Sequence, residues 1–134
     1  MLLSTSKTAS CLLLFRPNVF VNLNEMVGER GWQRQSGLLE SSLSSWIFYE
    51  TEREQLASVF RSLVKNHPFV DGNKRTAVLW LLTMAELCEL PVVNDDALFD
   101  CVVEVAAGKF DVSQIAERLF ATDVASASLN PTVE

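Results

Sequence analysis

The chain has 134 residues, of which 49% are apolar and 21% are charged, with 5 glycines and 4 prolines. This composition is typical of one globular domain and excludes a wholly disordered, collagen-like or low-complexity chain. The formal net charge of −6 disfavours nucleic acid as a partner, because contacts with phosphates need clustered Lys and Arg side chains.

Residues 1–17 are predicted to be an N-terminal extension. Its apolar run, Cys11–Phe15, is too short for the hydrophobic segment of a secretory signal. The charge-free run Thr76–Ala85 is likewise too short to cross a membrane. We therefore expect a cytoplasmic protein with no membrane partner. Weak candidates for strands occur only at Leu12–Phe15 and Val19–Leu23.

The three cysteines, Cys11, Cys88 and Cys101, lie far apart in the sequence, and His67 is the only histidine. Because there is no Cys-x-x-Cys pair and no Cys/His cluster, the sequence indicates neither a structural zinc site nor a disulfide framework. We interpret the thiols as small apolar fillers in a reducing compartment.

The middle of the chain is predicted to be helical, since no segment there alternates with a period of two residues. A helix is predicted over Gly37–Glu50, with one buried face formed by Leu39, Leu43, Trp46 and Ile47. Thr51 and Glu54 form a capping-box pattern at the start of the next helix, which Pro68 ends. The amphipathic stripe of that helix consists of Leu56, Val59, Phe60, Leu63 and Val64.

A further helix over Thr76–Leu90 is apolar on nearly every side and is therefore predicted to be the buried central helix, ending before Pro91. Asn94 is predicted to cap the following helix, and Gly108 suits the left-handed position at its end. Its inner face consists of Leu98, Cys101, Val102 and Val105. Asp111 with Gln114 is predicted to cap a last short helix that carries Ile115 and Leu119. Residues 121–134 are predicted to be a flexible tail, and the fold class is all-α.

One segment, His67–Ala77, places dense polar and charged residues at the start of the apolar helix. Asp71 or Asn73 can cap that helix, and Gly72 lets a ligand approach the backbone closely. The N–H groups of the first turn then form an anion site. Lys74 and Arg75 stand in the same turn, where cations oppose the helix dipole. A bound anion would offset that cost.

Asp71 beside these cations is a candidate ligand for Mg²⁺, which takes one or two carboxylates together with phosphates. His67 is a candidate acceptor for the proton of a hydroxyl group. Taken singly, each feature also has an ordinary structural explanation. The histidine would bond the last helix carbonyls, the Asp-Gly-Asn sequence would form a turn, and the cations would pair with Glu52, Glu54 or the tail. Together the features favour a site that handles phosphate, although the segment is not a P-loop.

The segment His67-Pro-Phe-Val-Asp-Gly-Asn-Lys-Arg resembles the core motif of the Fic/Doc family, His-x-Phe-x-Asp/Glu-Gly-Asn-Gly/Lys-Arg. Lys74 in place of glycine resembles the death-on-curing (Doc) branch. Gly37–Leu43 is similar to the Gly-Leu-Leu-Glu-Ser-Ala-Leu segment of that branch, Val19–Met26 to its first helix and Ala106–Lys109 to its penultimate turn. The resemblance covers residues 18–120. It implies an all-α, Fic/Doc-like helical bundle in which the motif loop precedes a buried central helix.

The resemblance also implies a role for each residue of the motif. His67 would deprotonate the attacking hydroxyl, and Asp71 would bind Mg²⁺. Gly72 and Asn73 would cradle phosphate oxygens, together with Lys74 and Arg75. Arg75 would neutralise charge on the β- and γ-phosphates, while Lys74 would turn the nucleotide so that the γ-phosphate faces the hydroxyl. His67, Lys74 and Arg75 are thus the expected catalytic residues.

By the same resemblance the chain is expected to be the toxin of a toxin–antitoxin module, a protein kinase that uses ATP and Mg²⁺. The implied target is elongation factor Tu, so that the modification blocks translation. The implied partner is an antitoxin whose C-terminal segment folds onto the toxin, since the chain carries no inhibitory Fic helix motif.

Two alternatives stay open. One is transfer of AMP, which is disfavoured because Val78 stands where AMP-transferring members carry a second arginine. The other is a catalytically silent interaction domain, suggested by the short connection between Leu43 and Thr51.

Overall fold

The computed structural model describes residues 16–121 of the chain. Within this range it contains six α-helices and one short 3₁₀ helix, and the extended pairings are two isolated bridges. The all-α fold class predicted from the sequence is confirmed. The helices are α2 (Pro17–Met26), α3 (Leu38–Leu43), α4 (Glu52–Asn66), α5 (Asn73–Cys88), α6 (Asp95–Ala106) and α7 (Val112–Leu119), and the 3₁₀ helix is η1 (Ser45–Phe48).

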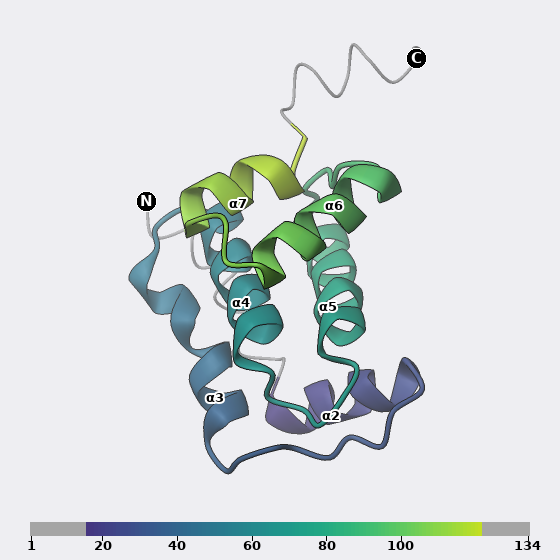
Figure 1. Cartoon of the computed structure of the whole chain (residues 1–134). Helices are drawn as coiled ribbons and strands as arrows, with labels where there is room; N and C mark the ends of the chain where they lie inside the picture. The colour runs from purple at the N-terminus through teal and green to yellow at the C-terminus, as the bar shows by residue number, and fades with distance from the viewer. Residues whose placement is uncertain (1–15, 122–134) are drawn as a thin grey trace.

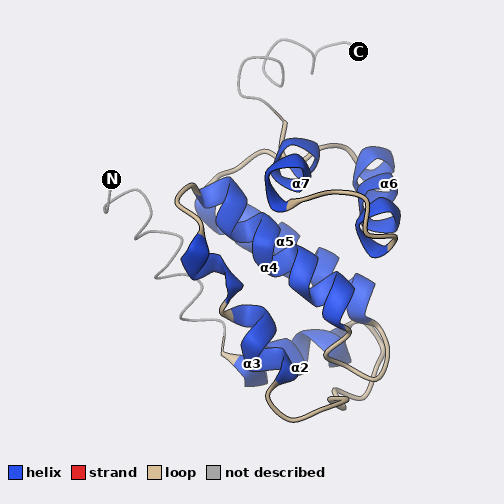
Figure 2. Cartoon of the chain, turned by 60° about the vertical axis from the view of Figure 1, so that its left-hand side comes forward, coloured by secondary structure: helices blue, strands red, loops and turns tan. Residues whose placement is uncertain are grey.

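Two long helices, α4 and α5, form the centre of the molecule and are joined by the loop of residues 67–72 (Figure 1). Helix α2 lies beside the loop end of this pair, and α3 and η1 pack along α4. Helices α6 and α7 pack on α4 and on each other, away from α2 (Figure 2). The motif loop is therefore fixed between two helices of the core and covered at one end by α2.

Helix α4 forms where its sequence predicts. The Thr51 hydroxyl accepts a hydrogen bond from the Glu54 N–H at 3.2 Å, which is one of the two bonds of the predicted capping box. All five side chains of the predicted stripe are buried in the core. The helix ends at Asn66, one residue before His67 and two before Pro68, as the effect of proline on the preceding residue requires.

Helix α5 is the central helix, but it differs from its prediction in two ways. It begins at Asn73 rather than Thr76 and ends at Cys88, because Glu89 takes a left-handed conformation with φ 58°. Trp80, which is fully buried, faces the core, whereas Leu82 and Leu87 are 42% and 50% exposed. The prediction of a helix buried on nearly all sides is therefore wrong for one of its faces.

The single helix predicted over Gly37–Glu50 is divided into α3 and η1. Three serine hydroxyls, of Ser42, Ser44 and Ser45, donate to backbone carbonyls three or four residues earlier, at 2.9–3.2 Å. Such bonds compete with the regular helix ladder. As a result the predicted buried face is wrong at Ile47, which is 59% exposed.

The weak strand prediction at Val19–Leu23 is wrong, because these residues lie in α2. The helix expected from the family resemblance over Val19–Met26 is present. Phe20 and Leu23 are spaced three residues apart and are buried, and the Phe20 ring lies 5.9 Å from the Trp80 ring. The other strand candidate, Leu12–Phe15, lies outside the described residues.

The remaining helix signals are confirmed. Asn94 accepts from the Ala97 N–H at 2.9 Å at the start of α6, and Gly108 after its end has φ 81°. Asp111 and Gln114 form both bonds of the capping box of α7. Among the described residues no helix has the length and apolar character needed to span a membrane.

Candidate active site

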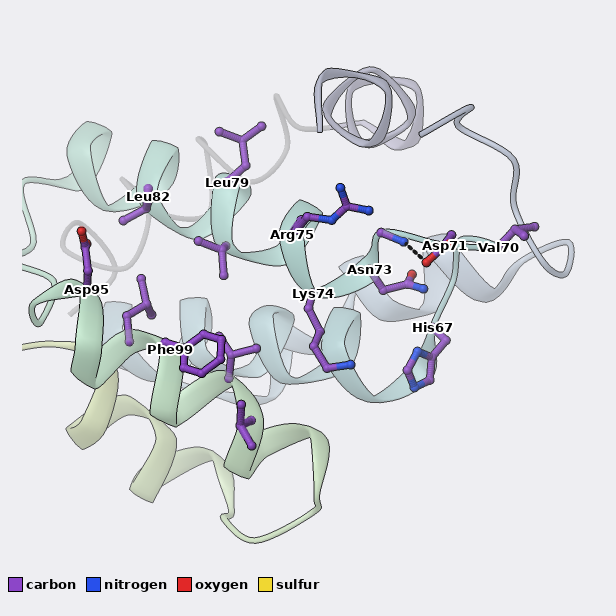
Figure 3. A pocket seen from close by; sticks show the side chains of 15 residues that line it. His67, Val70, Asp71, Asn73, Lys74, Arg75, Leu79, Leu82, Asp95 and Phe99 are labelled. Atoms are coloured by element: carbon purple, nitrogen blue, oxygen red, sulfur yellow. Dashed lines mark hydrogen bonds between the residues drawn. The ribbon is translucent and has the colours of Figure 1, made fainter. Parts of the chain in front are cut away.

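A pocket of about 800 Å³ opens between the motif loop, the first half of α5 and helix α6 (Figure 3). All six residues that the sequence assigns to the site line this pocket: His67, Asp71, Gly72, Asn73, Lys74 and Arg75. The other walls come from Val70, from apolar side chains of α5 and α6, and from Asp95 at the start of α6. The volume is within the range of small-molecule sites, and a polar end beside an apolar wall is their usual character.

His67 occupies the polar end of the pocket. It follows the last residue of α4 and has a left-handed backbone, with φ 51° and ψ 61°. Its side chain is exposed, and within residues 16–121 no hydrogen bond of the imidazole is found. The ring is therefore accessible from the pocket. The alternative explanation, in which His67 bonds the last carbonyls of α4, is wrong, because the Asn66 carbonyl accepts from Arg34 instead.

Asn73 holds the loop in shape. Its Oδ1 accepts from the Phe69 N–H at 2.8 Å and its Nδ2 donates to the Phe69 carbonyl at 2.9 Å, so both ends of the buried amide are used. The prediction that Asn73 or Asp71 caps α5 is wrong, since the N-cap is Gly72, which has no side chain. Because the side-chain amide is buried and bonded to the loop, the backbone N–H is the donor of Asn73 at the uncapped start of α5.

Gly72 is required by its conformation and by its neighbours. It has φ 75°, and a Cβ atom there would lie 2.5 Å from Cγ of Glu29. The group that comes close to the backbone of Gly72 is therefore the side chain of Glu29, which follows α2. The first intrahelical donor of α5 is the Thr76 N–H, which bonds the Gly72 carbonyl at 2.9 Å. The earlier N–H groups of α5, which have no side-chain cap, are the kind of donors that bind anions at helix ends.

Lys74 and Arg75 extend in opposite directions. In Figure 3 the Lys74 side chain extends toward the side on which His67 lies, whereas Arg75 extends toward α2. The Arg75 guanidinium donates to the Val27 carbonyl at 2.8 Å and forms an ion pair with Glu29. The ion pairs considered from the sequence, with Glu52 or Glu54, are therefore wrong for Arg75, and Glu29 was not indicated by any local pattern.

Asp71 is exposed, and its Oδ1 accepts from the Gly72 N–H at 2.8 Å (the dashed line in Figure 3). Within residues 16–121 no hydrogen bond of its other carboxylate oxygen, Oδ2, is found, and the residue lines the pocket. Among residues 16–121, no three His, Cys, Asp or Glu side chains form a group that could hold a metal ion. A Mg²⁺ ion at Asp71 would therefore take most of its ligands from phosphates and water, which is how this ion is usually bound beside a nucleotide.

The structure adds two polar residues that sequence reasoning missed. Asn24 of α2 is buried and makes three bonds, to the Asp71 carbonyl at 2.9 Å, to Thr76 Oγ1 at 3.1 Å and from the Gly31 N–H at 2.9 Å. Asn24 follows the buried Phe20 by four residues, so it lies on the apolar face of the helix. A polar residue on such a face is the sequence signal that could have identified it. Arg34, which bonds the end of α4, has no such signal.

The apolar wall was also missed. It includes Leu79 and Leu82 of α5 and Phe99 and Val103 of α6. Leu82, Phe99 and Val103 are 42%, 68% and 48% exposed, so this wall is open to a ligand. The sequence placed Leu79 and Leu82 in a helix predicted to be buried on nearly every side, and it made no prediction for Phe99 or Val103. The separation of α5 from α6 makes both faces part of the pocket (Figure 3).

Residues 22–85 match the model of the Fic/DOC family. The matched range begins in α2 and ends in α5, so it contains the motif loop and both helices that hold it. The match supports the family that the motif resembles, and the all-helical fold agrees with it. No curated protein shows a significant match to the chain.

Proposed function

We propose that this chain acts as a Doc-like member of the Fic/DOC family, transferring the γ-phosphate of ATP to a hydroxyl group of a target protein. One observation carries the proposal. The accessible imidazole of His67, the uncapped first turn of α5 and the Lys74 ammonium line the same pocket. A base and an anion site at one pocket are what transfer of a phosphoryl group to a hydroxyl needs.

In the proposed reaction His67 accepts the proton of the target hydroxyl. The hydroxyl oxygen then forms a bond to the γ-phosphorus, and the bond from that phosphorus to the β–γ bridging oxygen breaks, so that ADP leaves. His67 suits this role because its ring is accessible and because it lies beside the cationic turn that would hold the phosphates.

The phosphates would lie against the first turn of α5. The N–H groups of Asn73, Lys74 and Arg75 precede the first intrahelical donor and would donate to phosphate oxygens. Lys74 would add a positive charge on the His67 side of the pocket. Asp71 is the residue that would hold Mg²⁺, and that ion would neutralise phosphate charge when bound. Arg75 would bind a phosphate only if its guanidinium left Glu29 or contacted the phosphate and Glu29 at the same time.

The apolar wall of α5 and α6 would receive the nucleoside, since it borders the cationic turn and includes the exposed ring of Phe99. The target proposed by resemblance is elongation factor Tu, in which case the chain would be a toxin that blocks translation in the cytoplasm. Its partner would be an antitoxin whose C-terminal segment covers the site. No contact with nucleic acid or a membrane is part of this proposal.

A second candidate is transfer of AMP by the same pocket, with a different phosphorus facing the hydroxyl. Val78 disfavours it, because an apolar side chain lines the pocket where AMP-transferring relatives carry their second arginine. A third candidate is a silent interaction domain. The observation in its favour is that Arg75, an expected phosphate ligand, is already paired with Glu29.

The test is the intact mass of elongation factor Tu after incubation with this protein, ATP and Mg²⁺. We expect the mass to increase by one phosphoryl group, and we expect His67→Ala to abolish the increase while the circular dichroism stays helical. An increase by one AMP group would instead establish the second candidate. No change in mass, together with no binding of ATP, would leave the interaction domain as the explanation.

A further inference from the structure

The end of α4 is not closed by the chain that follows it. The last carbonyls of a helix need donors, which usually come from the N–H groups of the next residues. Here Pro68 has no N–H group. The Phe69 N–H donates to Asn73 Oδ1 at 2.8 Å, and the Val70 N–H donates to the Trp32 carbonyl at 2.9 Å. The backbone around His67 therefore needs a donor from elsewhere.

Arg34 supplies that donor three times. Its NH2 group donates to the Asn66 carbonyl at 3.0 Å, its Nε to the His67 carbonyl at 2.6 Å, and its backbone N–H to the Pro68 carbonyl at 2.9 Å. Three successive carbonyls, with that of His67 in the middle, thus accept from one residue. A cation at a helix C-terminus is also favoured by the helix dipole.

The guanidinium has the geometry for this task. Its donors are fixed in one plane, so two bonds to neighbouring carbonyls set the orientation of the backbone between them. That backbone is the left-handed conformation of His67, with φ 51°, which residues other than glycine rarely adopt. Arg34 does not line the pocket itself. Its effect on the site is transmitted through the backbone of His67.

We propose that Arg34 is a positioning residue, which holds the backbone of His67 so that its imidazole stays in the pocket. The inference rests on the proposed function, because the position of the ring affects transfer only if His67 accepts the proton. A displacement of about 1 Å at a reacting group can lower a rate by about 100-fold. Binding of ATP, which does not use the imidazole, is left unchanged by this role.

The test compares Arg34→Met and Arg34→Lys with a matched control, Arg30→Met. Arg30 precedes Arg34 by four residues in the same segment, and its guanidinium lies 4.9 Å from the Trp32 ring. In the transfer assay described above, we expect Arg34→Met to lower kcat by about 10- to 100-fold with KM for ATP within about twofold of wild type. Arg34→Lys restores part of kcat, since it keeps the charge and one donor, and Arg30→Met matches the wild type.

A second readout does not depend on activity. His67 is the only histidine, so its imidazole signals in a nuclear magnetic resonance spectrum are assigned without ambiguity. We expect these signals to shift or broaden in Arg34→Met and to stay in place in Arg30→Met.

Several results would overturn the inference. They are a kcat of Arg34→Met equal to that of wild type, an equal loss in Arg30→Met, or unchanged imidazole signals in Arg34→Met. If Arg34→Met does not fold, Arg34→Lys decides, and wild-type kcat in that variant counts against positioning. If the wild type transfers nothing, the proposed function fails instead, and the imidazole signals alone decide the role of Arg34.

Discussion

At the scale of single residues, the main feature of the site is the pairing of Arg75 with Glu29. A cation in the first turn of a helix opposes the dipole, and the carboxylate of Glu29 offsets its charge within the chain. The Cγ atom of the same side chain lies beside Gly72, where the proposed function places phosphate. Under the proposed function, Glu29 would compete with the nucleotide for Arg75 and repel its negative charge.

Removal of that carboxylate is expected to strengthen nucleotide binding. An exposed ion pair is worth up to about 1 kcal/mol, so Glu29→Gln should lower the Kd for ATP by about two- to fivefold. The pair is exposed enough for solvent to screen it, with side-chain exposures of 56% for Arg75 and 24% for Glu29. Isothermal titration calorimetry measures the change, with Glu25→Gln as the control. Equal affinities in wild type and Glu29→Gln would show that Arg75 does not contact the phosphates.

At the scale of elements, the start of α5 differs from the starts of α4, α6 and α7. Side chains of Thr51, Asn94 and Asp111 cap α4, α6 and α7, whereas α5 begins at a glycine with no side-chain cap. The missing cap leaves N–H groups for a ligand, and the loop is held from outside the helix by Asn24. The start of α5 is therefore stabilised by Asn24 of α2 rather than by a side chain of its own N-cap residue.

Gly72→Ala tests this arrangement against Gly37→Ala. Both glycines have positive φ, 75° and 83°, so each substitution costs about 1–2 kcal/mol from backbone strain. Only at position 72 does the new methyl group also meet a side chain, Glu29 Cγ at 2.5 Å, whereas nothing lies within 4 Å at position 37. We therefore expect the larger loss of unfolding free energy, and a loss of ATP affinity, in Gly72→Ala.

Urea denaturation measures the first effect and calorimetry with ATP the second. Equal destabilisation by the two substitutions would mean that the loop moves to accept the methyl group. In that case the close contact with Glu29 would not constrain the site.

At the scale of the whole molecule, the core is organised around α4 and α5 and is closed on one side by α6 and α7. Cys88 and Cys101 are buried and free of disulfides. This agrees with the interpretation of these two thiols as apolar fillers, while Cys11 lies outside the described residues. Burial raises the pKa of the Cys101 thiol from 9.0 to about 11, an effect that Arg118 reduces and Glu104 reinforces.

Cys101 is therefore expected to resist alkylation in the folded protein. The reactive form is the thiolate, and a pKa higher by about two units leaves about 100-fold less of it at neutral or mildly alkaline pH. Because the pKa is raised, the reactivity should increase with pH up to about 11. Iodoacetamide labelling at about pH 8, read by peptide mass spectrometry, should be slow in the folded chain and fast in urea. Fast labelling of Cys101 in the folded chain would contradict its place in the core.

Local sequence alone determined the parts of this protein that depend on neighbouring residues. The caps at Thr51, Asn94 and Asp111, the apolar stripe of α4 and the polar motif after His67 are all patterns within one helix or one turn. Their interactions span three or four residues, so the order of the residues is enough to predict them. The same is true of the six residues that the motif assigned to the pocket, because they follow one another along the chain.

Only the tertiary structure decided which distant groups complete the site. Asn24 bonds Thr76 across 52 positions, Arg75 bonds Val27 across 48 and Arg34 bonds Asn66 across 32. The tertiary structure also decided that one face of α5 is open to the pocket, because the space beside that face depends on where α6 packs. Such contacts depend on how the helices approach one another. The residue pattern of a single helix carries no information about that approach. The sequence therefore predicted the fold class and the motif, and packing decided what surrounds His67 and Arg75.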